Sequence, residues 1–405
     1  MKTIKDLDVR AKKVLVRVDF NVPLDSHHQI TDDTRMKKAL PTINYLLQEG
    51  AAVLLCSHLG RPQKKKNEDG SINVEKFTLR HLVNHLTRLT GAEVLFAENC
   101  VGGDTELMAE RLKPGQILLL ENTRFHAGES KGDMDLAIQL SRLADCYIND
   151  AFGTAHRAHA STATVANNYF KPEEKALGFL IMDEIESADK LLKSPKRPVV
   201  AIVGGAKVSD KIQLLEKLVE VVNHVCIGGG MAYTFKKALG GSIGQSICED
   251  DYLDLALEIL AKAKELGTEI HLPIDTMIAD DFNNDANTDV VDTDKIPNDW
   301  EGLDIGPKSI AAFTKIILEA QSILWNGPMG VFEMETFATG TNQIALAVGK
   351  ATENGAYSLI GGGDSVAAIN KAGLAETVSF VSTGGGAMLE YLEGKTLPGI
   401  KAITG

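Results

Sequence analysis

Four segments in the second half of the chain share one pattern, in which an apolar run of strand length breaks into glycines and resumes as a helical sequence. They are residues 199–207 (VVAIVGGAK), 225–232 (VCIGGGMA), 358–365 (SLIGGGDS) and 378–387 (VSFVSTGGGA). Glycine lets the backbone turn through φ > 0 and lets an anion approach main-chain N–H groups at a helix N-terminus. Because parallel strands end at one edge of a sheet, the four corners predict a site for the phosphates of a nucleotide.

Strand-like runs alternate with amphipathic sequences along nearly the whole chain. Strands are expected at residues 14–18, 52–56, 94–97, 117–120 and 146–149, and near residues 200, 225, 270, 323, 359 and 378. Helices are expected at residues 79–89, 134–144, 212–222, 252–266 and 308–319. Such alternation is typical of parallel sheets covered by helices on both faces, so the chain is predicted to be an α/β protein with two such sheets.

The length of the chain favours two domains. A chain of 405 residues exceeds what one hydrophobic core usually supports, and two domains of about 200 residues are expected. A charged helical sequence at 182–192 lies between two proline-containing turns, and a long helix there would connect the domains. We expect an N-terminal domain at 1–171, a connecting helix and linker at 172–197 and a C-terminal domain at 198–394, with the tail at about 395–405 returning to the first domain.

Composition excludes several classes of partner. A formal net charge of −13 argues against nucleic acid and anionic membranes, which need a basic face. Residues 1–20 contain no apolar signal segment, and no run approaches 18 apolar residues, so a cytoplasmic protein is expected.

The five cysteines show no CxxC or Cys/His ligand spacing and are expected to be reduced, buried thiols. The acidic segment 280–294 lacks the pattern of an EF-hand and is expected to be an exposed loop or hairpin.

Short polar and basic clusters follow the strands of the first half, at residues 17–23, 58–62, 121–126 and 149–161. In a parallel sheet these clusters would converge at one edge, bringing together Asp19, Asn21, His58, Arg61, Arg124, His156 and Arg157. Arginine forks bind phosphate or carboxylate oxygens in pairs, so the recurrence predicts a small, strongly anionic ligand. His156 and His159 lack a third ligand at suitable spacing, which argues against a metal site there.

Taken in order, these segments resemble the phosphoglycerate kinase family. The resemblance runs nearly end to end, through RVDFNVP, SHLGRP, LLENTRF, NDAFGTAHRAHAS, GGAKVSDK, GGGMAYTF, WNGPMGVFE, GGGDSVAA and STGGGAMLEYLEGK. It implies two Rossmann-like doubly wound parallel-sheet lobes joined by a hinge helix. It also implies a glycolytic enzyme that reversibly transfers the acyl phosphate of 1,3-bisphosphoglycerate to Mg-ADP, giving 3-phosphoglycerate and ATP. Small departures occur at residues 161–166 and in the short tail, and neither touches an implied site residue.

The resemblance also implies roles for individual residues. The phosphoglycerate site would consist of Asp19, Asn21, Arg35, His58, Arg61, Arg124, His156 and Arg157. The nucleotide site would consist of Gly204, Gly205, Lys207, Lys211, Gly229, Asn326, Pro328, Glu333, Gly361, Gly362, Gly363, Asp364 and Ser365. Glu333 would accept hydrogen bonds from the ribose hydroxyls. Asp364 would contact the nucleotide's magnesium, although its position at a helix start also fits an N-cap.

The catalytic group that the resemblance implies surrounds the phosphoryl group in transfer. Its members would be Arg35, Lys207, Lys211, Gly362, Gly363 and Gly385. An acyl phosphate is already activated, so direct in-line transfer needs no protein nucleophile, only alignment and compensation of charge. Lys207 and Lys211 would share one helix face only if the turn is already helical at Lys207. The protein is also expected to be a monomer. Its two domains are expected to close about a hinge at residues 172–198 and after Gly394.

Other protein classes fit the sequence less well. The segment GGAKVSDK lacks the GK[ST] of a Walker A loop, so a P-loop kinase is a poor analogy. A Rossmann dehydrogenase would carry GxGxxG after the first strand, and RVDFNVP stands there instead. The remaining alternative is a non-catalytic, two-lobed protein that binds a nucleotide or sugar phosphate. It would share the glycines and arginines without needing lysines at the lobe boundary, and a coupled assay with 3-phosphoglycerate and ATP separates it from a kinase.

Overall fold

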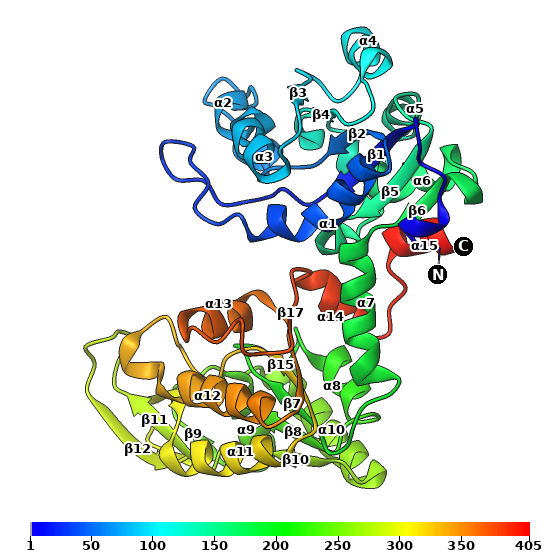
Figure 1. The fold of residues 1–405 in the computed structure, drawn as a ribbon. Coiled ribbons are helices and arrows are strands. Elements are labelled where there is room, and N and C mark those ends of the chain that lie inside the picture. The colour runs from blue at the N-terminus through cyan, green and yellow to red at the C-terminus, as the bar shows by residue number, and fades with distance from the viewer. Residues whose placement is uncertain (1) are drawn as a thin grey trace. The chain divides into compact units, whose positions relative to one another are not determined.

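The computed structural model describes residues 2–405 and divides into two compact units (Figure 1). Unit 1 contains the residues up to Ile185 together with Thr396–Gly405, and unit 2 contains Glu186–Lys395. The boundary falls inside helix α7 (Phe179–Leu192), which lies within the sequence segment expected to connect two domains. Each unit has its own sheet and its own hydrophobic core.

Unit 1 is built on a parallel sheet of six strands in the order β3-β4-β2-β1-β5-β6. The strands are β1 (Lys13–Val18), β2 (Ala52–Cys56), β3 (Val94–Phe96), β4 (Ile117–Leu119), β5 (Cys146–Asp150) and β6 (Lys175–Leu177). Every residue of β2, β4 and β5 is buried, as in strands covered on both faces. Successive connections run to one side of β1 until the chain returns to β5 on its other side, so the topological switch point lies between β1 and β5.

Helices cover both faces of this sheet. They are α1 (Thr34–Gln48), α2 (Val74–Phe77), α3 (Val83–Thr90), α4 (Gly103–Arg111), α5 (Met134–Ser141), α6 (Val165–Tyr169) and α15 (Pro398–Thr404). Short turns of helix join them at Ile4–Asp6, Pro62–Lys64, Leu79–Leu82, Thr123–Phe125, Glu129–Lys131, Phe152–Thr154, Ala160–Thr164 and Pro172–Glu174. Side chains of α1 and α3, such as Ile43 and Leu86, pack with Val14, Val16 and Val18 in one core. The opposite face of β1 carries Leu15 and Arg17.

Helix α15 belongs to unit 1 although all of unit 2 precedes it in the chain. Its Gly399 N–H donates to the carbonyl of Ala155 at 2.8 Å. The carbonyl of Gly399 accepts a bond from Asn149 Nδ2 at 3.2 Å. Gly399 is buried, and a Cβ there would press against Asn149 and Ala155, so only glycine allows this close approach. The helix thereby supports the turn that follows β5.

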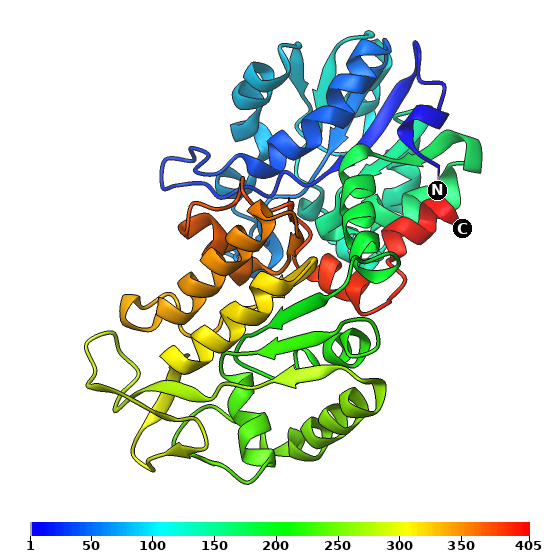
Figure 2. The ribbon, with the colours of Figure 1, turned by 60° about the horizontal axis from the view of Figure 1, so that its bottom comes forward.

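Unit 2 repeats the plan with a parallel sheet of six strands in the order β10-β8-β7-β15-β16-β17. Figure 2 shows strands of this sheet, in green, between helices of the same unit. The strands are β7 (Val199–Val203), β8 (His224–Ile227), β10 (Glu269–His271), β15 (Ser322–Asn326), β16 (Tyr357–Ile360) and β17 (Phe380–Val381). Counted within this sheet, the order is the 3-2-1-4-5-6 of doubly wound dinucleotide-binding proteins. Its switch point lies between β7 and β15, where ligands of such sheets bind.

The helices of unit 2 are α8 (Ile212–Leu218), α9 (Met231–Ala238), α10 (Leu253–Leu266), α11 (Pro307–Glu319), α12 (Thr339–Glu353), α13 (Gly363–Lys371) and α14 (Gly386–Leu392), with short turns at Asp250–Tyr252 and Glu335–Phe337. One core joins side chains of α11, α12 and α13, such as Phe313, Val348 and Ile369, to the face of the sheet that carries Trp325. The helix expected at 212–222 ends earlier, at Leu218, and residues 219–221 form turns.

Two smaller sheets complete unit 2. Strands β11 (Asp275–Ala279), β12 (Thr288–Asp292) and β14 (Glu301–Ile305) form an antiparallel sheet, and β9 (Ser242–Ile243) pairs with β13 (Lys295–Ile296). The acidic segment expected to be a loop or hairpin is the β11–β12 hairpin, whose loop is held by bonds from Asn287 to Asp280.

All five cysteines are free thiols, four of them buried. Across residues 2–405, no helix combines the length and apolar character that crossing a bilayer requires.

Candidate functional site

The polar residues expected at the edge of the first sheet do lie together after the carboxyl ends of β1, β2, β4 and β5. We call this group the arginine cluster: Asp19, Asn21, Arg35, His58, Arg61, Arg124, His156 and Arg157. Asp19 and Asn21 follow β1, His58 and Arg61 follow β2, and Arg124 follows β4. His156 and Arg157 follow the helical turn Phe152–Thr154 after β5, and Arg35 lies in the first turn of α1.

Asp19 and Asn21 hold neighbouring parts of the arginine cluster in place. Arg35 Nη1 donates to Asp19 Oδ2 at 3.2 Å and to the carbonyl of Asn21 at 3.1 Å. The side-chain oxygen of Asn21 accepts the N–H of Gly60 at 2.8 Å. These bonds connect the segment after β1 to helix α1 and to the loop after β2. One face of Arg35 is thus fixed by protein oxygens while the residue stays half-buried.

The other arginines differ in how far they are fixed. Arg124 is buried, and its Nη1 donates to the carbonyl of Gly60 at 2.6 Å. Arg157 Nε donates to His156 Nε2 at 3.1 Å. Arg61 is exposed at the start of the turn Pro62–Lys64. The cluster therefore combines two guanidinium groups anchored to protein oxygens, those of Arg35 and Arg124, with the exposed Arg61.

Arg17 lies beside the arginine cluster and was not among the residues expected there. It is fully buried in β1, and its Nε donates to Ser161 Oγ at 2.8 Å. Ser161 Oγ donates in turn to Glu129 Oε1 at 2.6 Å, and Arg17 Nη2 lies 3.2 Å from His58 Nδ1. Arg17 also bonds the carbonyl of Val18. The signal in the sequence was a lone arginine inside the apolar run VLVRV, which a buried counter-charge must compensate.

The titration of the cluster reflects crowded positive charge. Burial lowers the pKa of His58 well below its usual value, and the guanidinium groups of Arg17, Arg124, Arg35 and Arg157 lower it further. Burial lowers the pKa of Arg124 to about 10, with Arg157 and Arg17 adding to the effect. His159 has its pKa lowered to about 4 by burial and by the same arginines. Because cations repel one another here, an anion bound at the cluster would be strongly stabilised.

Glycine-rich corners follow β7, β8, β15 and β16 in unit 2, and we call them the glycine edge. The corner after β7 contains Gly204 and Gly205, and the corner after β8 contains Gly229. The corner after β15 begins at Asn326 and continues through Pro328, while Gly361, Gly362 and Gly363 lead from β16 into α13. The first and third of these corners flank the switch point between β7 and β15.

Some glycines of this edge are required by packing. A Cβ on Gly204 would overlap the carbonyl oxygen of Pro328, and a Cβ on Gly229 would press against the backbone of Gly205. By contrast, Gly205, Gly363 and Gly385 have open space around the position of a Cβ. Gly204 and Gly229 therefore let the corners approach one another, whereas the open glycines are those that leave room for a ligand.

Lys211 and Lys207 differ in their surroundings: Lys211 contacts the glycine edge, whereas Lys207 is exposed to solvent. Lys211 Nζ donates to Asn326 Oδ1, and burial lowers the pKa of Lys211, opposed mainly by Asp364. Lys207 is exposed. Helix α8 begins at Ile212 with Lys211 as its N-cap, so the turn is not helical at Lys207 and the two lysines do not share a helix face. The shared helix face expected for a helical turn at Lys207 is therefore absent, because residues 205–210 contain no helix.

Asn326 carries the clearest sign of an incomplete polar site. The residue is 1% exposed, and its Nδ2 has no hydrogen-bond partner within residues 2–405. A buried amide without a partner is costly unless a ligand or water meets it. Next to it, Ser365 Oγ accepts the N–H of Gly327. Asp364 and Glu333 are exposed, the former in the first turn of α13.

An α/β fold with a cluster of arginines in one unit and glycine corners at a dinucleotide-type switch point in the other defines a class of protein that binds phosphorylated ligands. The model of the family "Phosphoglycerate kinase" matches residues 4–395. The chain therefore belongs to the phosphoglycerate kinase family, and it is an enzyme of the transferase class.

Individual relatives agree with this membership. A phosphoglycerate kinase of Porphyromonas gingivalis is 50% identical, with 100% of both chains covered. One of Synechococcus sp. (strain JA-2-3B'a(2-13)) is also 50% identical and covers 98% of this chain and 96% of its own. The structure of phosphoglycerate kinase from Coxiella burnetii superposes with a TM-score of 0.86 at 40% identity, covering 99% of this chain and 98% of that chain. The enzyme from Pyrococcus horikoshii OT3 gives 0.80 at 31% identity, covering 100% and 98%. Two doubly wound lobes, expected from the sequence, are thereby confirmed as the fold.

Proposed function

We propose that the chain catalyses the reversible transfer of the acyl phosphate of 1,3-bisphosphoglycerate to Mg-ADP, giving 3-phosphoglycerate and ATP in glycolysis. The observation that carries this proposal is the match to the family over residues 4–395, which includes both the arginine cluster and the glycine edge. The chemistry of each site is consistent with it, since one favours a small anion and the other backbone contact with phosphates.

The arginine cluster would hold the phosphoglycerate. Arg61, Arg124 and Arg157 supply guanidinium groups for the phosphate and carboxylate oxygens, and Asp19 and Asn21 supply oxygen acceptors for the hydroxyl. His58 and His156 complete the site, with His58 neutral because its pKa is lowered by burial and by the nearby arginines. Arg35 keeps unused N–H donors while it is anchored to Asp19. It would direct them to the phosphoryl group in transfer.

The glycine edge would hold the nucleotide. The phosphates would lie against N–H groups of Gly205 and of the corner formed by Gly361, Gly362 and Gly363, while Glu333 would accept the ribose hydroxyls. Gly204, Gly229 and Pro328 would shape the corners, and Asn326 and Ser365 would fix their backbone. Lys207, Lys211 and Gly385 would compensate charge on the phosphoryl group, together with Gly362 and Gly363. No protein nucleophile is required, because in-line transfer from an acyl phosphate needs only alignment and charge compensation.

The residues present fit a magnesium ion carried by the nucleotide. Mg²⁺ is usually held by one or two carboxylates together with substrate phosphates, and Asp364 places one exposed carboxylate in the first turn of α13. When bound, the ion would neutralise charge on the phosphate oxygens. Asp364 would hold it, with Lys211 nearby to share that compensation.

Transfer also requires both units to act on one phosphoryl group. We therefore include in the proposal a monomeric cytoplasmic enzyme, with phosphoglycerate held by an N-terminal domain and nucleotide by a C-terminal domain. The domains close about residues 172–198 and after Gly394. Small-angle scattering of the ligand-free, two singly bound and doubly bound forms should give the smallest radius of gyration with both ligands. The same radius in all four forms would argue against closure.

A coupled assay with 3-phosphoglycerate and ATP tests the reaction itself. Turnover that depends on both substrates and on Mg²⁺ is expected. Binding of both ligands without turnover would favour the alternative, a non-catalytic protein that binds a nucleotide or sugar phosphate.

A further inference from the structure

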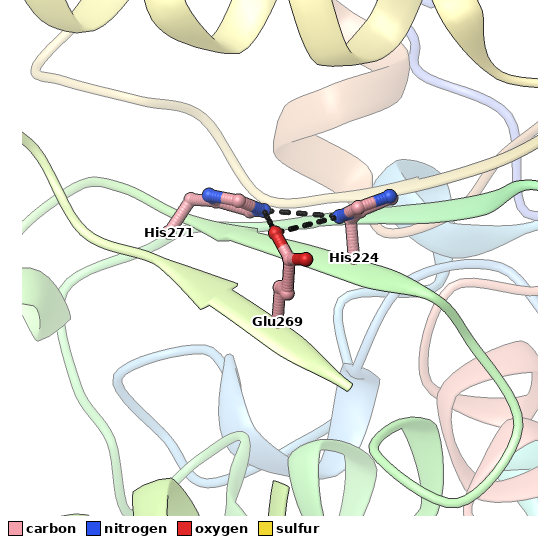
Figure 3. A group of neighbouring side chains, drawn as sticks. All are labelled: His224, Glu269 and His271. Atoms are coloured by element: carbon pink, nitrogen blue, oxygen red, sulfur yellow. Dashed lines mark hydrogen bonds and ion pairs between the residues drawn. The ribbon is translucent and has the colours of Figure 1, made fainter. Parts of the chain in front are cut away.

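Three potential metal ligands lie together on the sheet of unit 2, and we call them the β8–β10 triad: His224, Glu269 and His271 (Figure 3). His224 begins β8 and pairs in register with Glu269, the first residue of the edge strand β10. His271 follows two residues after Glu269, so its side chain leaves the strand on the same face. The two histidines are half-buried and the glutamate is exposed.

The triad lies away from the glycine edge. His224 is at the amino end of β8, whereas the glycine corner follows the carboxyl end of the same strand at Ile227. The proposed nucleotide site therefore does not use these three side chains, and the reaction assigns them no role. His224 precedes Glu269 and His271 by more than 40 residues, so only two of the three ligands lie close together in the sequence.

The donor atoms are spaced as the ligands of one small cation are. His224 Nδ1 lies 3.1 Å from His271 Nε2, and each nitrogen lies 3.6 Å from Glu269 Oε2. A triangle with these sides has one point about 2.0 Å from all three corners. Zinc–nitrogen and zinc–oxygen bonds in proteins are about 2.0 to 2.2 Å long. A cation at that point would meet all three donors at bonding distance without any movement of the backbone.

A hydrogen bond between the two histidines explains the geometry of the triad less completely than a bound cation does. A single proton between the two ring nitrogens makes one hydrogen bond, and that nitrogen pair then offers the carboxylate no second donor. The rings are tilted by 36° with centroids 5.3 Å apart, so they do not stack face to face. Figure 3 shows both rings and the carboxylate directed at one another.

We propose that the β8–β10 triad binds a divalent transition-metal ion of the zinc class, with water completing its coordination. Two imidazoles and one carboxylate form a ligand set that suits Zn²⁺, whereas Mg²⁺ prefers an all-oxygen shell. The site is distinct from the magnesium that accompanies the nucleotide. Because β10 has only three residues and lies at the edge of the sheet, the bound ion would also clamp this short strand to β8.

The test measures zinc binding to the untagged full-length chain without nucleotide, by competition with a chromogenic chelator. We expect one equivalent of Zn²⁺ to bind to the wild-type chain. His224→Asn and His271→Asn should each weaken binding by at least about tenfold, since loss of a direct ligand should exceed the effect of losing an indirect one. His27→Gln, at an exposed histidine of unit 1, and Cys248→Ser, at the least buried thiol, are the matched controls and should bind as the wild type does.

Unchanged zinc affinity in both triad variants would overturn the proposal, as would a loss of affinity confined to Cys248→Ser. A second measurement does not depend on the variants folding. Anomalous diffraction at the zinc edge from wild-type crystals soaked in Zn²⁺ should show a peak between the three side chains. A peak only at other positions, or none at a concentration that saturates binding in solution, would overturn it.

Discussion

The two sheets of this chain present different chemistry at their carboxyl ends. In unit 1 the strands end in charged side chains, and a fully buried arginine lies inside the central strand itself. In unit 2 four strands, β7, β8, β15 and β16, lead into glycine corners. Under the proposed function, this difference lets one architecture serve two kinds of ligand. Side chains suit a small anion with several oxygen groups, whereas main-chain N–H groups suit phosphates that must approach closely.

The largest effect is expected for Lys211→Ala, which removes a charge from the glycine edge. If Lys211 compensates charge that develops during transfer, kcat should fall by about 10²- to 10³-fold while substrate affinities change less. Steady-state kinetics provide the measurement. Lys217→Ala is the control, since Lys217 is in the last turn of the same helix and pairs with Glu220 at 3.0 Å. A variant that keeps more than about a third of the wild-type kcat would contradict the role.

Substitutions in the arginine cluster should affect the binding of 3-phosphoglycerate and leave the binding of nucleotide unchanged. Arg157→Ala and Arg61→Ala should raise KM for 3-phosphoglycerate by about 10- to 100-fold, because each removes a charged contact to the anion. Nucleotide affinity should stay close to that of the wild type. Arg142→Ala, at an exposed arginine after α5, is the control. Weaker ADP binding with unchanged 3-phosphoglycerate binding would assign these arginines to the wrong ligand.

Alanine substitution of two glycines of unit 2 should affect different properties, stability in one variant and nucleotide binding in the other. Gly204→Ala places a Cβ on the carbonyl oxygen of Pro328, so unfolding free energy should fall by about 2 to 3 kcal/mol. Gly363→Ala meets open space and should leave stability within about 0.5 kcal/mol while weakening nucleotide binding. Urea unfolding and a nucleotide titration of each variant give the answer. Equal stability of the two variants would show that the close approach of the corners does not require glycine.

The smallest effect concerns the acid sensitivity of unit 1. The pKa of His159 is lowered to about 4 in the fold from an ordinary value of 6.5, so the unfolded chain binds the proton more readily between these values. Stability contributed by neutral His159 is therefore complete above pH 6.5 and is lost as pH falls towards 4.

His159→Gln should remove about 1 to 2 kcal/mol of this pH dependence, as followed by urea unfolding across that range. The same substitution at His27 should leave the slope unchanged. A wild-type slope in His159→Gln would show that other groups account for the acid sensitivity.

Much of the fold could be predicted, because apolar runs followed by glycine or by polar clusters mark the ends of buried parallel strands. The order of strands in unit 1 could not be predicted, since nothing in the local pattern distinguishes an edge strand such as β3 from β4 beside it. The strand expected near residue 378 is only Phe380–Val381, because an edge strand needs few pairing residues. Alternation specifies layers, and strand order depends on long-range packing.

The sites were predictable where the chemistry lies beside a motif. Arg124 and Arg157 stand in such motifs, whereas Glu129 was not identified, because its link to Arg17 passes through Ser161 from a distant segment. The sequence likewise did not distinguish Gly204, which is needed for packing, from Gly205, which has open space. That distinction depends on which neighbouring corner the glycine meets, and only the folded chain shows it.

The position of helix α15 has a consequence for synthesis. Because Gly399 supports the turn at Ala155 and Asn149, a chain still emerging from the ribosome can complete unit 2 before unit 1 acquires its final contacts. A nascent chain that stops after Lys395 would contain every residue of the arginine cluster but not the helix that supports its last loop. Under the proposed function, anion binding by the newly made protein would therefore depend on translation of residues that follow the whole sheet of unit 2.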